Sequence, residues 1–168
     1  MVFERFYALD PSSGALDGRI SKYDLNCATS KPNALYGTRF NPLLENHGDL
    51  MRLNDKPRIR VSKNATLGSK TASSFTFHGM KVKPLDIPLG YTTLNLEGIR
   101  REPSLERLSW KVDFPQGFHV PLVVDIAEFT KGRWNELQAL EIWADFHNEG
   151  VVMDWEFCLD DLELSFDR

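Results

Sequence analysis

Residues 153–168 constrain the fold most, because their apolar side chains fall at every second position. The apolar members, interrupted by an Asp-Asp pair, are Trp155, Phe157, Leu159, Leu162, Leu164 and Phe166. Alternation with a period of two is typical of a β-strand that has one face in a core and the other in water. The pattern therefore predicts a core strand here, with the side chains of Cys158 and Asp160 on the solvent side.

Similar alternation recurs along the chain and predicts about eight or nine short strands, spaced by about ten residues. The predicted strands cover residues 2–9, 58–62, 75–77, 80–82, 92–97, 108–114, 118–126, 139–146 and 151–166. Gly79 shifts the register between two of them, as a β-bulge does. Residues 128–138 allow one helical turn. We expect a single all-β domain over residues 1–168, built as an antiparallel sandwich of two sheets.

Composition argues against two classes of partner. The net charge is −4, whereas a nucleic-acid-binding domain normally carries a basic excess. No apolar run reaches the roughly 18 residues that a membrane-spanning helix needs. We therefore expect neither a nucleic acid nor a membrane as a partner. Edge strands of a sandwich can pair between copies, so both a monomer and a dimer fit the sequence.

Three residues bear on secretion. Asn64 begins an Asn-Ala-Thr glycosylation sequon, which is a weak signal because such triplets arise by chance. Cys27 and Cys158 are the two cysteines, and they fit either reduced buried thiols or one disulfide that closes a long loop. Their positions near opposite ends of the chain favour the disulfide. We therefore expect a secreted protein whose signal peptide is absent from this sequence.

Residues 40–57 carry more apolar side chains than a solvated loop needs, namely Leu43, Leu44, Leu50, Met51 and Leu53. Such a segment either caps one end of the core or forms a lid over a ligand cavity. If it forms a lid, these five side chains contact the substrate.

Motifs for nucleophilic or metal chemistry are missing from the sequence. It contains no Gly-x-Ser-x-Gly elbow, and its histidines are too isolated to form a zinc pattern. Carboxylates cluster late in the chain, and Asp161 is the one that we expect to turn inward. We predict no metal or cofactor for the reaction, and a structural Ca²⁺ with Asp160 or Asp161 as ligand stays an open alternative.

Trp143 follows Ile142 on a predicted strand and therefore points away from the face of Leu140 and Ile142. An exposed tryptophan on a sheet face is a platform for a sugar ring or an apolar ligand. The alternative is that a neighbouring loop covers the ring. Trp143 is thus a candidate substrate-binding residue.

Four segments, residues 20–27, 31–37, 110–119 and 154–161, resemble a family of small secreted proteins of filamentous fungi. The likeness extends over nearly the whole chain. The closing Phe-x-Leu-Asp-Asp-Leu-Glu-Leu is also similar to the last strands of jelly-roll modules that bind carbohydrate, which implies a jelly-roll sandwich. The fungal group resembles, in turn, the hetero-Diels–Alderases of tropolonic sesquiterpenoid biosynthesis.

That resemblance implies a cofactor-free pericyclase that holds two apolar reactants, a quinone methide and a terpenoid alkene, in one hydrophobic pocket. Such a reaction needs close approach of the reactants and a donor that polarises the heterodiene carbonyl. Side chains of this sequence that are able to act as the donor are His78, His119, Lys81 and Tyr91. Two alternatives stay open: a non-catalytic carbohydrate-binding module that uses Trp143, and a structural or host-interaction protein without a small ligand.

Overall fold

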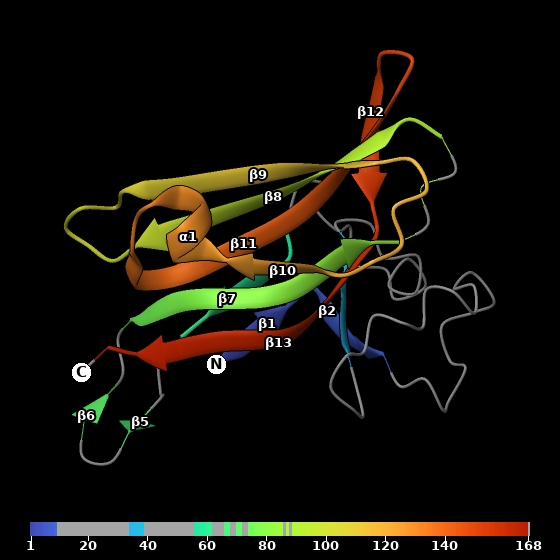
Figure 1. Ribbon diagram of the computed structural model, residues 1–168. Coiled ribbons are helices and arrows are strands. Elements are labelled where there is room, and N and C mark those ends of the chain that lie inside the picture. Colours follow the sequence, from blue (N-terminus) through green and yellow to red (C-terminus); the bar gives the residue numbers. More distant parts are fainter. Residues whose placement is uncertain are drawn as a thin grey trace, which may run out of the picture.

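The computed structural model describes residues 1–9, 34–38, 56–61, 66–67, 70–71, 74–85, 87 and 89–167 (Figure 1). Its elements are β1 (Val2–Glu4), β2 (Phe6–Leu9), β3 (Ala34–Gly37), β4 (Arg58–Arg60), β5 (Thr66–Leu67), β6 (Lys70–Thr71), β7 (Phe75–Pro84), β8 (Tyr91–Arg100), β9 (Arg107–Pro115), β10 (Leu122–Asp125), α1 (Ile126–Thr130), β11 (Trp134–Asn148), β12 (Val151–Trp155) and β13 (Phe157–Phe166). The chain is therefore all-β, as the alternating sequence predicts.

Within the described residues, eleven strands join into one curled antiparallel sheet, and β5 pairs separately with β6. The main path runs β1–β4–β11–β7–β13–β3–β2. Strands β10, β12 and β8 branch from this path, β10 beside β7 and the other two beside β11, and β9 continues outward from β8 (Figure 1). The long strand β11 holds the sheet together, because different parts of it pair with β8, β4, β7 and β12.

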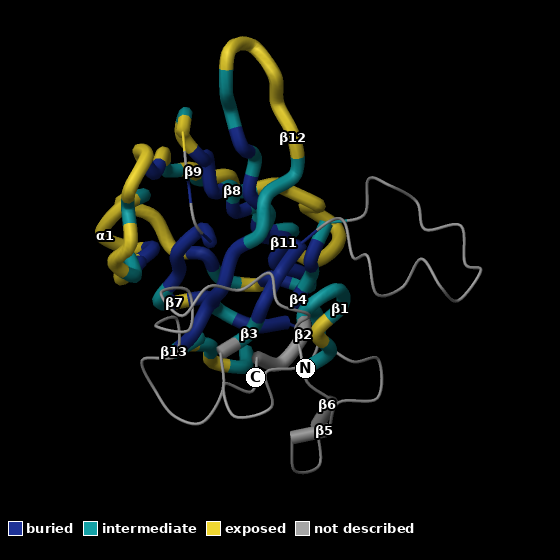
Figure 2. The backbone as a smooth tube through the Cα atoms, turned by 90° about the vertical axis from the view of Figure 1, so that its right-hand side faces the viewer, coloured by how far each residue is buried: buried dark blue, intermediate teal, exposed yellow. Residues whose placement is uncertain are grey.

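The core lies on the inner face of the curled sheet. On β11 and β8 the inward positions alternate with polar ones, and Leu94, Leu140 and Ile142 have no exposed surface. Strand β9 follows the alternation that its sequence predicts, with its apolar side chains on the better-buried face. Figure 2 shows the buried residues gathered along β7, β8, β11 and β13, and exposed residues at the β11–β12 turn.

The C-terminal alternation forms two strands instead of one. Strand β12 pairs with β11, whereas β13 lies between β7 and β3. Residues 157–160 of β13 are all buried, so both faces of the strand are covered at this end. The prediction that Cys158 and Asp160 face solvent is therefore wrong, since both are buried.

The expected inward turn of Asp161 is also wrong. Asp160 is the buried carboxylate, and its Oδ1 accepts a hydrogen bond of 2.8 Å from the backbone N–H of Asp161. Asp161 has a φ of 47°, in the left-handed region, and the pairing of β13 with β7 shifts register at this point. The bulge turns the Asp161 side chain outward.

The helical turn begins two residues before the predicted range of 128–138 and overlaps its start, since α1 ends at Thr130. Asp125 precedes α1 as its N-cap, and its side chain accepts a hydrogen bond from the backbone N–H of Glu128. The cap satisfies one of the donors that a helix start leaves unpaired. Lys131 ends the helix in a left-handed conformation, and β11 begins three residues later at Trp134.

Several predictions fall outside the described residues: the glycosylation at Asn64, Cys27 of the predicted disulfide, and the apolar segment with Leu43, Leu44, Leu50, Met51 and Leu53. These stay predictions. In the described part of the chain, no helix has the length and apolar character to cross a membrane.

Candidate functional site

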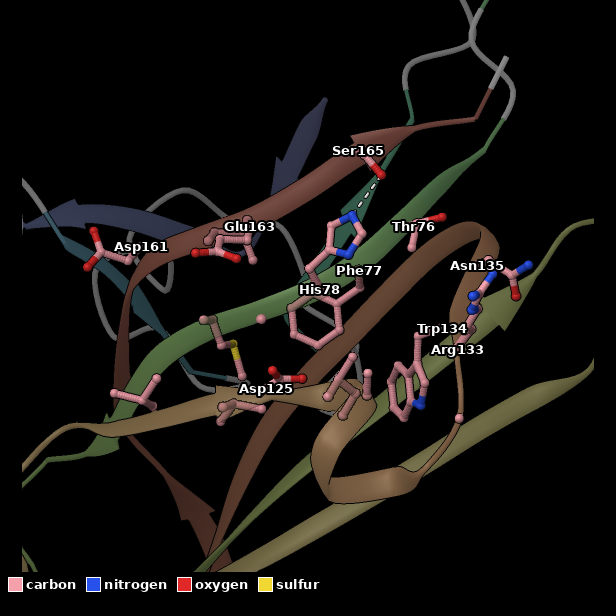
Figure 3. A pocket seen from close by; sticks show the side chains of 18 of the residues that line it. Thr76, Phe77, His78, Asp125, Arg133, Trp134, Asn135, Asp161, Glu163 and Ser165 are labelled. Atoms are coloured by element: carbon pink, nitrogen blue, oxygen red, sulfur yellow. Dashed lines mark hydrogen bonds between the residues drawn. The ribbon is translucent and has the colours of Figure 1, made fainter.

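A groove of about 950 Å³ lies over β7 (Figure 3). Residues 161–167 of β13 and its end form one wall. The other wall is formed by the end of β10, by α1 and by the start of β11, with residues 123–127 and 132–135. Its volume is that of an ordinary small-ligand site.

The groove arises because β7 changes its neighbour along its length. Its first half pairs with β11, with Trp134 opposite Phe77, and its second half pairs with β10, with Val124 opposite Met80. The chain between β10 and β11 folds into α1 at this change. Phe77 and Met80 are both buried although they are three residues apart, which confirms the register shift predicted at Gly79.

Gly79 is also what lets β10 approach β7. A Cβ atom at this position would overlap the carbonyl oxygen of Val124. Any larger residue would push the two strands apart, so the missing side chain sets the width of the groove.

Polar side chains of strands β13 and β7 line the first side of the groove. Lys81 Nζ forms an ion pair of 2.6 Å with Asp161 Oδ2, and both side chains are about one-third exposed. The hydrogen bond to Asp161 raises the pKa of Lys81, against a smaller opposing effect of desolvation. Farther along, the His78 Nε2 and Ser165 Oγ atoms lie 2.8 Å apart (Figure 3).

The second wall is held in place by hydrogen bonds. Asn135 Oδ1 accepts a bond of 3.0 Å from the Arg100 guanidinium. Asp167, at the end of the first wall, accepts two bonds, from the Thr76 hydroxyl at 2.8 Å and from the backbone N–H of Glu136 at 3.1 Å, and the latter joins the two walls. Among the described residues, Arg133 is a groove cation with no ion-pair partner. The walls therefore present donors and acceptors in fixed positions.

The structure brings together two of the four predicted donors, His78 and Lys81, in this groove. Tyr91 lies elsewhere, at the start of β8, where its ring stacks on His147 with 4.6 Å between centroids. His119 is exposed in the connection between β9 and β10. Neither Tyr91 nor His119 lines the groove.

Trp143 lies on the outer face of the sheet, as its position after Ile142 predicts. The indole Nε1 donates a hydrogen bond of 3.0 Å to Asp145 Oδ2, and Lys56 Nζ lies 3.5 Å from the ring centroid. The ring is half-buried and is not part of the groove. Its role in substrate binding stays a prediction.

Sequence reasoning missed most of the groove residues, among them Asp125, Arg133, Asn135, Glu163 and Ser165. They meet only because β7, β10, β11 and β13 are adjacent in the sheet. One signal was readable: Asp125 with Glu128 three residues later is the spacing of a helix-capping pair.

No group of three or more His, Cys, Asp or Glu side chains is placed to hold a metal ion in the described part of the chain. The chain matches no protein-family model, no curated protein and no solved structure. Function is therefore argued from the chemistry of the groove alone.

Proposed function

We propose that the chain is a binding domain for a saccharide, which lies along the groove over β7. The observation that carries this proposal is the density of fixed donors and acceptors on both walls. A sugar hydroxyl donates one hydrogen bond and accepts others, so it matches walls that offer both kinds of group. Asn135, Lys81 and Asp161 supply amide, ammonium and carboxylate partners.

An apolar ligand fits these walls less well. It would displace water from the charged side chains without replacing the hydrogen bonds, and each polar group left unpaired costs about 1–3 kcal/mol. A saccharide satisfies the same groups directly or through bridging water. The polar and charged side chains among the lining residues thus favour the carbohydrate-binding alternative, with the groove taking the place of the Trp143 face.

The cycloaddition expected from the resemblance is the second candidate. The observation that favours it is the joint presence of His78 and Lys81 in one groove of suitable volume. In this function the Lys81 ammonium donates a hydrogen bond to the heterodiene carbonyl as negative charge develops on its oxygen. The groove walls hold the two reactants in contact.

Isothermal titration distinguishes the two candidates. One series of ligands contains cello-, xylo- and galacto-oligosaccharides, and the other contains tropolone–sesquiterpenoids. We expect saturable heat with at least one saccharide and a loss of at least fivefold in affinity for N135A and K81A. K111A is the matched control, because Lys111 is exposed on β9 outside the groove. Binding of terpenoids alone would replace the first proposal by the second.

The finer expectations about the protein's setting are part of this proposal: a jelly-roll order of strands, export from the cell, and a disulfide between Cys27 and Cys158. Peptide mapping by mass spectrometry without reduction tests the last of these. We expect one cross-linked peptide pair that separates on reduction, whereas two alkylated cysteines without prior reduction would contradict the disulfide.

A further inference from the structure

The contact between Ser165 and His78 in the groove has no part in the proposed saccharide binding. They come from adjacent strands, since Ser165 lies opposite Thr76 in the pairing of β13 with β7. The distance of 2.8 Å between Ser165 Oγ and His78 Nε2 is within hydrogen-bond reach, and both side chains are exposed to the groove. A hydroxyl next to an imidazole is the arrangement that activates a serine as a nucleophile.

We propose that Ser165 and His78 form a nucleophile–base pair that hydrolyses ester groups on a saccharide bound in the groove. This inference rests on the proposed function and adds a substrate class, namely O-acylated sugars. The reaction needs only water as co-reactant, so it agrees with a site built from side chains alone.

The ester bond of the substrate joins the carbonyl carbon of an acyl group to a sugar oxygen. Ser165 Oγ attacks the carbonyl carbon while His78 Nε2 accepts the hydroxyl proton. The bond between the carbonyl carbon and the sugar oxygen breaks, and His78 returns the proton to that oxygen. Water then attacks the acyl-Ser165 ester, with His78 accepting and returning one proton, which releases the carboxylic acid and restores the serine.

Arg133 is suited to stabilise the oxyanion that forms during attack. Arg133 lines the same groove, whereas the other cation, Lys81, is engaged by Asp161. A donor aimed at the developing negative charge accelerates acyl transfer, typically by about 100- to 1,000-fold per donor.

His78 lacks the third member of a triad among the described residues, because no carboxylate is hydrogen-bonded to its Nδ1 atom. A serine with a general base alone gains roughly 100- to 10,000-fold over the uncatalysed reaction. We therefore expect a slow esterase whose rate is nevertheless well above that of buffer.

The test uses the full chain with two probes: per-O-acetylated glucose, with acetate release as the readout, and a fluorophosphonate that labels activated serines. Wild type is compared with S165A, H78Q and the control S109A, since Ser109 is exposed on β9 outside the groove. We expect acetate release at least tenfold above buffer, a loss to the buffer rate in S165A and H78Q, and wild-type rates in S109A. The fluorophosphonate adduct should map to Ser165.

Saccharide binding is measured on the same samples, so that failure of each idea is visible separately. S109A should bind the deacetylated oligosaccharide as wild type does, because Ser109 lies outside the groove. Folded wild type that binds saccharides but shows neither acetate release nor an adduct would overturn the esterase inference and leave the binding function intact. Equal rates in S165A and wild type would also overturn it. Absence of any saccharide binding would instead overturn the proposed function.

Discussion

Lys56 Nζ lies 3.5 Å from the centroid of the Trp143 ring on the outer face of the sheet. The same ammonium is 3.0 Å from Glu97 Oε2, so it joins an aromatic face to a carboxylate. Strand β4, which follows Lys56, pairs with β11, which carries Trp143. One face of the indole is thus occupied by a side chain of the protein itself.

Removal of the Lys56 ammonium should make the Trp143 ring more accessible to solvent. We expect K56M to lower the free energy of unfolding by about 1 kcal/mol, since a partly exposed cation–π contact and an ion pair are lost. Acrylamide should quench Trp143 more strongly in K56M, measured as the difference from the W143F background. K111M is the control. Unchanged quenching would show that Lys56 does not cover the ring.

Ionisation of Glu97 makes the free energy of unfolding depend on pH in the acidic range. Burial raises its pKa, but hydrogen bonds from Arg107 and Lys56, together with their charges, outweigh burial and leave the pKa below the ordinary 4.5. Because the folded pKa is the lower one, this stabilisation is complete above pH 4.5. It is lost as the pH falls through the folded value. E97Q should therefore lose less stability than wild type on acidification below about pH 4 in urea unfolding.

The control for this experiment is E106Q, because Glu106 has an exposed side chain that pairs with Arg100 at the far end of β8. Its pH profile should follow that of wild type. If E97Q and wild type lose equal stability on acidification, the ion pairs of Glu97 do not contribute.

The Thr93 hydroxyl determines the tautomer of His147, that is, which ring nitrogen carries the hydrogen. Thr93 Oγ1 donates a hydrogen bond of 2.6 Å to Asp113 Oδ1, and its oxygen also lies 3.1 Å from His147 Nε2. A hydroxyl has one hydrogen, so His147 Nε2 must carry the proton and donate to Thr93. Nitrogen-15 NMR at mildly alkaline pH should show the Nε2–H tautomer. A bare Nε2 would contradict the network.

Loss of the Thr93 hydroxyl should lower the stability of the fold. We expect T93V to lower the free energy of unfolding by about 1 kcal/mol, because Thr93 is buried and two partners lose their hydrogen bonds. T93S, which keeps the hydroxyl, should recover most of that loss in urea titrations. Equal destabilisation by T93V and T93S would point to packing instead.

Gly79 should tolerate no side chain. We expect G79A to destabilise the fold by roughly 1–3 kcal/mol, because its Cβ meets backbone of β10 and not a movable side chain. The substitution should also weaken saccharide binding, since it moves one wall of the groove. G132A is a matched control in the same groove, where the nearest atom to a new Cβ is 3.7 Å away. Wild-type stability of G79A would show that β10 moves freely.

The strands were predictable because most have one covered face. Alternation fixed β9 and the second half of β11, where apolar side chains face the core and polar ones face water. It failed at β13, where Cys158 and Asp160 are buried as well as the apolar positions. A period of two does not reveal whether other parts of the chain cover the second face of a strand.

The groove was much less predictable. His78 and Lys81 were candidates because of their chemistry, but Ser165 joins His78 only through the pairing of β13 with β7. Asp125 and Arg133 reach the groove because α1 lies between β10 and the start of β11, which both pair antiparallel with β7. Contacts between residues of different strands depend on the order of the strands in the sheet, which local sequence patterns do not encode.

The most direct test of saccharide binding over β7 is a nitrogen-15 NMR titration of the full chain with the oligosaccharide series. We predict saturable amide shifts at residues 76–81, 132–135 and 161–165, which line the groove. Amide shifts confined to Tyr91, Trp143 and their neighbours would contradict the account, and so would a spectrum that no saccharide changes.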